Sequence, residues 1–255
     1  MDFIDFTDFT DFTDFKASLF SAIIKATTMS TPPLEISQKK LAITGAIAGL
    51  FVLVFGVLTH FSPATNALDA KVEWFFAGAR TPLWNSFFLV ITYLGSVEFI
   101  SMASVVLALI FLIRKKFAEF CIFLGVILAN TASIVIIKDF VERTRPITAF
   151  YSETSFSFPS GHTAISVLFY GMLAYLIATN LRDVRARTNI LFAWIFFMIM
   201  IGFSRMYLGV HFLTDVISGY AVGLFWLSVG ILSFELLMEQ RPPMWKKVLH
   251  LFKKK

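Results

Sequence analysis

Six apolar stretches, each about 20 residues long, dominate the chain between residues 41 and 237, and this is the length a helix needs to cross the hydrocarbon core of a bilayer. A spanning segment must satisfy its own backbone hydrogen bonds, which a helix does internally. The composition agrees, because 57% hydrophobic and only 15% charged residues lie far from the balance of a soluble domain. The sequence therefore predicts an all-α integral membrane bundle of six helices.

The predicted bundle is one six-span domain at residues 29–240. Its polar segment 62–84 is long enough for an interfacial helix between the first two spans. We place the spans at residues 41–61, 85–113, 117–137, 160–178, 189–208 and 213–237.

The two ends of the chain differ from the bundle. Residues 1–28 begin with a low-complexity Asp-Phe-Thr repeat whose period of three fits neither a helix face nor a strand, and they lack the basic region and cleavage site of a secretory signal. We interpret them as an artefact or a disordered segment, with Met29 as an alternative start. Residues 241–255 place basic residues among apolar ones, which predicts an amphipathic tail on anionic lipid.

The placement of lysine and arginine predicts the orientation, because cytoplasmic loops carry an excess of both. The loops with more lysine and arginine are predicted to lie on the same side of the membrane as both chain ends. Their cations are Lys39, Lys40, Arg114, Lys115, Lys116, Arg182, Arg185, Arg187 and the basic residues of 241–255. Both termini are therefore predicted to be cytoplasmic, in a multi-pass plasma-membrane protein.

Three polar clusters lie at span ends on the opposite, outer side. They are KDFVERTRP at Lys138–Pro146, PSGH at Pro159–His162 and SRMYLGVHFLTD at Ser204–Asp215. Ionisable residues at membrane depth are costly and mark functional sites. We therefore expect the three clusters to meet in one site that faces away from the cytoplasm.

The clusters contain side chains that can bind an anion such as phosphate. Arginine forks suit phosphate oxygens, and the helix start at Ser160 and Gly161 adds backbone N–H donors, with glycine permitting a close approach. The cations are Lys138, Arg145 and Arg205, and the imidazoles are His162 and His211.

Two histidines across a phosphate can divide the chemistry, one attacking phosphorus and the other protonating the departing oxygen. A helix that starts near His211 would set Asp215 on the same face, four residues on, where it would fix the imidazole tautomer. This partner favours His211 as the attacking group, although residue chemistry alone leaves the choice open. No His/Cys grouping or carboxylate cluster has metal-ligand spacing.

The three clusters, read as K-x6-RP, PSGH and SR-x5-H-x3-D, resemble the signature motifs of the type 2 phosphatidic acid phosphatase superfamily, a family of integral-membrane lipid phosphatases. All three are complete and in order, and the resemblance extends over residues 41–237. It implies a phosphatase domain that needs no metal or cofactor. The implied substrate is a membrane lipid phosphate or diphosphate: phosphatidylglycerophosphate, phosphatidic acid or undecaprenyl diphosphate.

The resemblance also implies a role for each motif residue. His211 would be the nucleophile that forms a phosphohistidine, Asp215 would orient it, and His162 would be the acid for the leaving group and then the base for water. The implied phosphate ligands are Lys138, Arg145, Ser160, Gly161 and Arg205.

Other polar residues near the motifs are interpreted as structural or solvated. We expect Arg143 to face solvent or lipid head groups, and Glu153, Ser155 and Ser157 to be ordinary loop polarity. Two other functions stay open: a lipid phosphotransferase that uses the same intermediate, and a non-catalytic protein that binds or transports lipid phosphates. No basic stripe with interleaved aromatics points to nucleic acid, and the sequence leaves the oligomeric state undecided.

Overall fold

The computed structural model describes residues 38–181 and 183–239, and every regular element among them is a helix. The predicted segments 1–28 and 241–255 lie outside the described residues. The helices are α2 (Gln38–Phe61), α3 (Pro63–Ala79), α4 (Pro82–Leu94), α5 (Val97–Ile113), α6 (Phe117–Val141), α7 (Gly161–Ala178), α8 (Val184–Tyr207) and α9 (Leu213–Glu239).

Local capping explains where several helices begin. Ser62 accepts the N–H of Thr65 at the start of α3, and a proline follows the cap, where its missing N–H costs nothing. Asp183 accepts the N–H groups of Arg185 and Ala186, so α8 begins five residues before the predicted residue 189. The predicted segment 62–84 contains the helix α3.

The predicted second span is two helices, α4 and α5, rather than one. Gly95 and Ser96 separate them, and the hydroxyl of Ser96 accepts the N–H of Phe99 to cap α5. A Cβ at Gly95 would lie 2.5 Å from Ile201 of α8 and 2.9 Å from Ser166 of α7. The break therefore sits where the chain presses against two neighbouring helices.

Helix α7 is the centre of the bundle. About 78% of its span is buried, against 22% for α6, and it contacts α5, α6, α8 and α9. Its side chains Leu168 and Met172 belong to a core of large apolar residues that also includes Phe111 of α5, Phe123 of α6 and Ile201 of α8. The outer helices keep apolar side chains exposed on their other faces, as a bundle in lipid requires.

Five helical segments of the described chain are long and apolar enough to cross a membrane. They are Pro82–Ile113, Phe117–Val141, Gly161–Ala178, Val184–Tyr207 and Leu213–Met238. Helix α2 occupies the first predicted span and packs along α9, but its apolar window, Ile43–Gly56, is shorter. The membrane bundle is thus confirmed, while the count of six spans stays a prediction.

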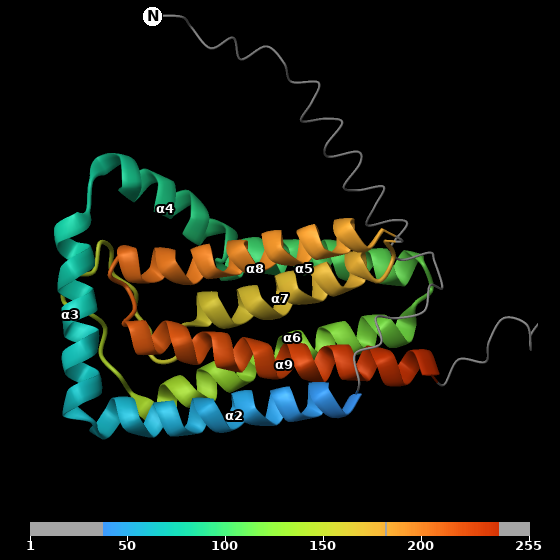
Figure 1. Ribbon diagram of the computed structural model, residues 1–255, viewed down its shortest axis with the longest axis horizontal. Coiled ribbons are helices and arrows are strands. Elements are labelled where there is room, and N and C mark those ends of the chain that lie inside the picture. Colours follow the sequence, from blue (N-terminus) through green and yellow to red (C-terminus); the bar gives the residue numbers. More distant parts are fainter. Residues whose placement is uncertain (1–37, 182, 240–255) are drawn as a thin grey trace, which may run out of the picture.

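One end of the bundle gathers the three polar clusters. Helix α3 crosses that end and contacts α8 and α9, while α6 and α8 finish there and α7 and α9 begin there (Figure 1). Helices α7 and α9 also approach closely, because a Cβ at Gly219 would lie 2.6 Å from the carbonyl oxygen of Ser160, and one at Gly223 would lie 2.6 Å from that of Ala164. Small residues spaced four apart are a common device for packing membrane helices.

Candidate active site

Hydrogen bonds to backbone carbonyls join the three clusters at this end. The N–H of Ser160 donates to the carbonyl of Asp215 at 2.9 Å, which joins the start of α7 to the first turn of α9. Arg145 Nη1 donates to the carbonyl of Val210 at 2.8 Å, which joins the first cluster to the third. The expectation that segments from all three motifs meet is confirmed.

His211 and Asp215 form a buried pair, but not on one helical face as we expected. Helix α9 begins at Leu213, so His211 lies in the turn before it. Asp215 reaches back: its Oδ2 accepts the backbone N–H of Phe212 at 2.9 Å and lies 3.4 Å from His211 Nδ1. A carboxylate in the first turn that bonds back to the residue before the helix is the acidic half of a capping box.

The other imidazole nitrogen faces a cation. His211 Nε2 lies 3.3 Å from Arg145 Nη1, and only 3% of the residue is exposed. Burial, and then the positive charges of Arg205, Arg145 and Lys138, hold the pKa of His211 well below its ordinary value. The ring is therefore neutral at neutral pH and keeps a lone pair, which a nucleophile needs.

The guanidinium of Arg145 is held by the loop that joins α6 to α7. Its Nε donates to the carbonyl of Ser155 at 2.7 Å, and its Nη2 donates to the Ser155 hydroxyl at 3.0 Å. Lys138, in the last turn of α6, donates to the carbonyl of Phe156 in the same loop. Two of the predicted phosphate ligands thus lie side by side against one loop segment.

Arg205 approaches from the end of α8 and is completely buried. Its Nη1 donates to Thr92 Oγ1 at 2.9 Å and to the Tyr151 hydroxyl at 2.5 Å, and its Nη2 forms an ion pair with Glu153. Such bonds fix the direction of a guanidinium that a snorkelling residue would leave free. Neither Thr92 nor Tyr151 stood out in the sequence.

The interpretation of Glu153 as ordinary loop polarity is wrong, because its carboxylate pairs with two arginines. One carboxylate oxygen pairs with Arg205, and the other lies 2.6 Å from Arg145 Nη2. Burial raises the pKa of Glu153, but the charges of Arg205 and Arg145 lower it by more, so the pKa lies below its ordinary value. A side-chain anion therefore occupies the place between two arginines where we expected phosphate. Ser157 is likewise buried, and its hydroxyl donates to the carbonyl of Thr144.

The second motif starts α7. Ser160 is its N-cap, with Oγ 2.9 Å from the Thr163 hydroxyl, and it is fully buried. His162 lies in the first turn of α7, at the end of the helix that Ser160 ties to Asp215. At Gly161 an added Cβ would make only ordinary contact, 3.6 Å from Ile134, so packing does not require this glycine. Close approach of a ligand remains the reason we propose for it.

Arg143 is the clearest correction, because we expected it to face solvent or head groups. Its side chain is only 11% exposed and bridges two buried carboxylates, with Nη1 2.7 Å from Asp215 Oδ1 and Nη2 2.6 Å from Asp69 Oδ2. No sequence pattern pairs Arg143 with Asp69, because 74 residues separate them and Asp69 lies on α3.

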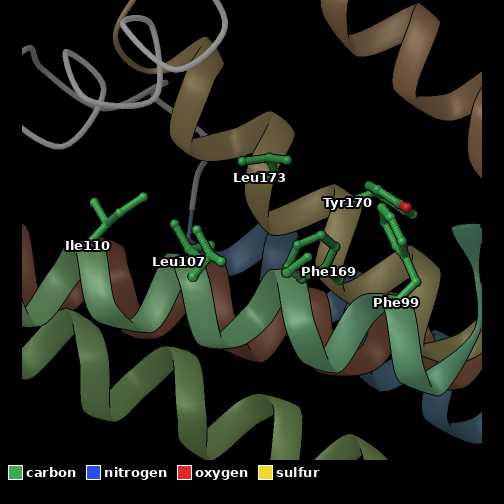
Figure 2. A pocket seen from close by; sticks show the side chains of 8 residues that line it. Phe99, Leu107, Ile110, Phe169, Tyr170 and Leu173 are labelled. Carbon is green, nitrogen blue, oxygen red and sulfur yellow. The ribbon is translucent and has the colours of Figure 1, made fainter. Parts of the chain in front are cut away.

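Two further observations concern other places where a ligand could bind. Among residues 38–181 and 183–239, no three His, Cys, Asp or Glu side chains gather as metal ligands would. An open hollow of about 300 Å³ lies between α5 and α7, and Figure 2 shows its apolar walls, with Phe99 and Leu107 on one helix and Phe169 and Leu173 on the other. No charged side chain and no motif residue lines the hollow.

Comparisons with known proteins show the family of this chain. The model of the PAP2 superfamily matches residues 118–238. Phosphatidylglycerophosphatase B of Bacillus subtilis is 31% identical over 180 residues, which are 69% of this chain and 87% of that protein. Lipid A 4'-phosphatase of Porphyromonas gingivalis is 30% identical over 166 residues, 58% of this chain and 64% of that protein.

Solved structures show the same fold. The crystal structure of a transmembrane PAP2 type phosphatidylglycerolphosphate phosphatase from Bacillus subtilis superposes with a TM-score of 0.70 at 26% identity, covering 78% of this chain and 98% of that one. Aquifex aeolicus LpxE, at 24% identity, shares the fold with a TM-score of 0.50 over 65% of this chain and 94% of its own. This chain therefore belongs to the PAP2 superfamily, the type 2 phosphatidic acid phosphatases that its three motifs resemble.

Proposed function

We propose that this chain is a membrane phosphatase that hydrolyses a lipid phosphate or diphosphate through a phosphohistidine on His211. The observation that carries the proposal is the setting of that imidazole. Its Nδ1 faces Asp215, and its Nε2 faces Arg145. A neutral ring held in this way presents its lone pair to an anion bound by the cations.

The proposed reaction has two balanced steps. Nε2 of His211 attacks phosphorus, the bond from phosphorus to the lipid oxygen breaks, and His162 gives that oxygen its proton. Water then attacks the phosphohistidine, His162 takes a proton from the water, and the bond between phosphorus and nitrogen breaks. The products are a lipid alcohol and inorganic phosphate, or a lipid monophosphate and inorganic phosphate from a diphosphate.

The cations supply the electrostatic part of catalysis. Lys138, Arg145 and Arg205 would bind the phosphoryl oxygens, together with the hydroxyl of Ser160 and the N–H of Gly161, because the N–H of Ser160 already donates to Asp215. Fixed charges and donors that need no reorganisation stabilise the charge of a five-coordinate transition state. Glu153 would have to leave the two arginines when the phosphate enters, and the phosphate would take over both ion pairs.

The substrate class follows from the setting of the site. A head group at the ends of spanning helices can reach the cations while its hydrocarbon tail stays in the bilayer. Because the Bacillus subtilis relative is named for phosphatidylglycerophosphate, we propose this lipid first. Phosphatidic acid and undecaprenyl diphosphate are the other candidates.

The test is phosphate release by the purified full-length protein in detergent micelles, with each of the three lipids in turn. We expect release from at least one lipid, retained in excess EDTA, and loss of turnover in His211→Ala. Label transferred to an acceptor lipid instead of water would favour a phosphotransferase. Binding of the lipid without release would favour a transport or binding protein.

We further propose six spans, with the site on the outer side of the plasma membrane and both termini inside. The chain has a single cysteine, Cys121, so Cys121→Ser gives a background for labelling. Thr154→Cys lies in the loop of the site and Lys115→Cys lies between α5 and α6, both at exposed positions. A membrane-impermeant maleimide added to intact cells should label the first and not the second; the reverse pattern would invert the orientation.

A further inference from the structure

We propose that Arg143 and Asp69 are positioning residues for the reaction: Asp69 fixes Arg143, Arg143 fixes the carboxylate of Asp215, and Asp215 orients His211. The inference rests on the proposed function, because it adds members to the same site. Neither residue belongs to the K-x6-RP, PSGH and SR-x5-H-x3-D positions to which we assigned roles.

The two oxygens of Asp215 have separate partners. Oδ1 accepts from Arg143 Nη1 at 2.7 Å, while Oδ2 accepts the N–H of Phe212 and faces His211 Nδ1. Rotation of the carboxylate would break one of these contacts. Arg143 therefore determines which way the second oxygen points, and so how the imidazole is held.

Asp69 provides the other half of the support from a different helix. It is 1% exposed, and its Oδ2 accepts from Arg143 Nη2 at 2.6 Å. It also accepts the N–H of Thr214 at 3.1 Å with Oδ1 and the Thr214 hydroxyl at 2.5 Å with Oδ2. An acid at the unsatisfied N–H groups of a helix start is favourable, so Asp69 anchors the turn that contains Asp215.

The direction of Arg143 distinguishes it from the proposed phosphate ligands. Its Nη1 bonds Asp215 and the Thr214 hydroxyl, both at 2.7 Å, its Nη2 bonds Asp69, and its guanidinium carbon lies 4.2 Å from the centre of the Phe212 ring. Arg145, two residues on, faces the opposite nitrogen of His211. One arginine therefore contacts the reacting side of the imidazole, and the other acts on its far side through a carboxylate.

The position of Asp69 in the chain adds to the argument. Helix α3 precedes the residues matched by the family model, 118–238, yet it supplies a buried carboxylate to the first turn of α9. Helix α3 thus contributes a buried carboxylate to the proposed reaction centre.

A double-mutant cycle in the full-length protein tests this chain of contacts. Asp69→Asn and Arg143→Met are each measured alone and together with Asp215→Asn, with kcat and KM for phosphate release. We expect each single variant to lower kcat by roughly 10-fold to 100-fold, the scale of coupling within one hydrogen-bond network, with little change in KM. In the Asp215→Asn background the further loss should be below about threefold, because the group they act through has already been changed.

Arg143→Met leaves two buried carboxylates without their cation and can prevent folding. Two milder variants therefore test the same contacts. Arg143→Lys keeps the charge without the fork and should retain more activity than Arg143→Met. Thr214→Val removes the hydroxyl shared by both partners and should lower kcat in the same direction. Rates are expressed per folded protein, measured by size-exclusion chromatography.

Arg80→Met is the matched control. Arg80 also lies at this end and donates to the carbonyls of Tyr207 and Thr148, but it has no bond to the carboxylate network. Its effect should multiply with that of Asp215→Asn. If Asp69→Asn and Arg143→Met also multiply, or act on KM alone, the positioning role is wrong while the phosphatase proposal stands. An intact protein that releases no phosphate would instead remove the phosphatase proposal.

Discussion

The Oδ2 atom of Asp215 lies 3.4 Å from Nδ1 of His211, across the turn that starts α9. A carboxylate beside Nδ1 favours the tautomer with its proton there, so the lone pair lies on Nε2, the nitrogen that faces Arg145. The same carboxylate closes the helix start by accepting the N–H of Phe212. One side chain thus sets both the backbone turn and the imidazole direction.

Asp215→Asn should therefore lower kcat by roughly 10³-fold to 10⁴-fold, the scale seen when a carboxylate that enforces a histidine tautomer is lost. An amide can donate to Nδ1 and stabilise the wrong tautomer, while the cations that bind the substrate stay in place. KM should change little. Steady-state phosphate release measures both constants, and a kcat within a few-fold of wild type would contradict the orienting role.

Glu153→Gln should strengthen inhibition by vanadate, a mimic of the five-coordinate phosphoryl group. The substitution removes the carboxylate that competes for Arg145 and Arg205. We expect roughly threefold to tenfold lower vanadate concentrations at half inhibition, as the loss of two ion pairs to a partly exposed carboxylate allows. Glu142→Gln is the control, because Glu142 is exposed in the same loop. Equal inhibition of both variants would show that Glu153 does not occupy the anion site.

The pH profile tests the state of His211. Since burial and three cations hold its pKa well below the ordinary value of about 6.5, the ring stays neutral as the pH falls through 6.5. The acid limb of kcat/KM assigned to His211 should lie below that pH. The substrate phosphate itself ionises near pH 6. Its pKa is measured by phosphorus NMR, and the kcat/KM profile is corrected for the change in substrate ionisation. A corrected limb at or above pH 6.5 would contradict a depressed pKa.

Gly219→Ala should impair the enzyme through the spacing of α7 and α9. A Cβ there would lie 2.6 Å from the carbonyl of Ser160 and 2.9 Å from Thr163, so the two helices must separate. Because these helices position His162 and His211, we expect a loss of both activity and thermal stability, the latter on the order of 1–3 kcal/mol. Gly125→Ala on α6 is the control, since nothing lies within 4 Å of its added Cβ. Unchanged activity and melting in Gly219→Ala would refute this packing role.

The membrane bundle and the meeting of the three motif segments were largely predictable from sequence, because both depend on local patterns. Apolar runs of spanning length predict helices whatever their neighbours are, and each motif lies at the end of a run. The break of the second run at Gly95 and Ser96 was not predicted. At Gly95, contact with Ile201 and Ser166 leaves no room for a side chain, and a local pattern does not reveal contacts between distant helices.

The residues that sequence reasoning misjudged are those whose role depends on a distant partner. Arg143 was predicted to be a solvated cation, but in the structure Asp69 of α3 forms an ion pair with it. Glu153 was interpreted as loop polarity, but the loop folds so that its carboxylate contacts Arg145 of the same loop and Arg205 of α8. One sequence does not show which distant residue a charged side chain will contact. The pairing is therefore seen only in the folded structure.

The most direct measurement is the covalent state of residue 211 during turnover. Rapid acid-free quenching of the protein with a lipid carrying labelled phosphate, followed by peptide mapping, should find the label on the peptide of His211. The bond should be labile in acid and stable in base, as a phosphorus–nitrogen bond is, and His211→Ala should neither be labelled nor turn over. Turnover by His211→Ala at a rate near wild type, or label on another residue, would contradict the account.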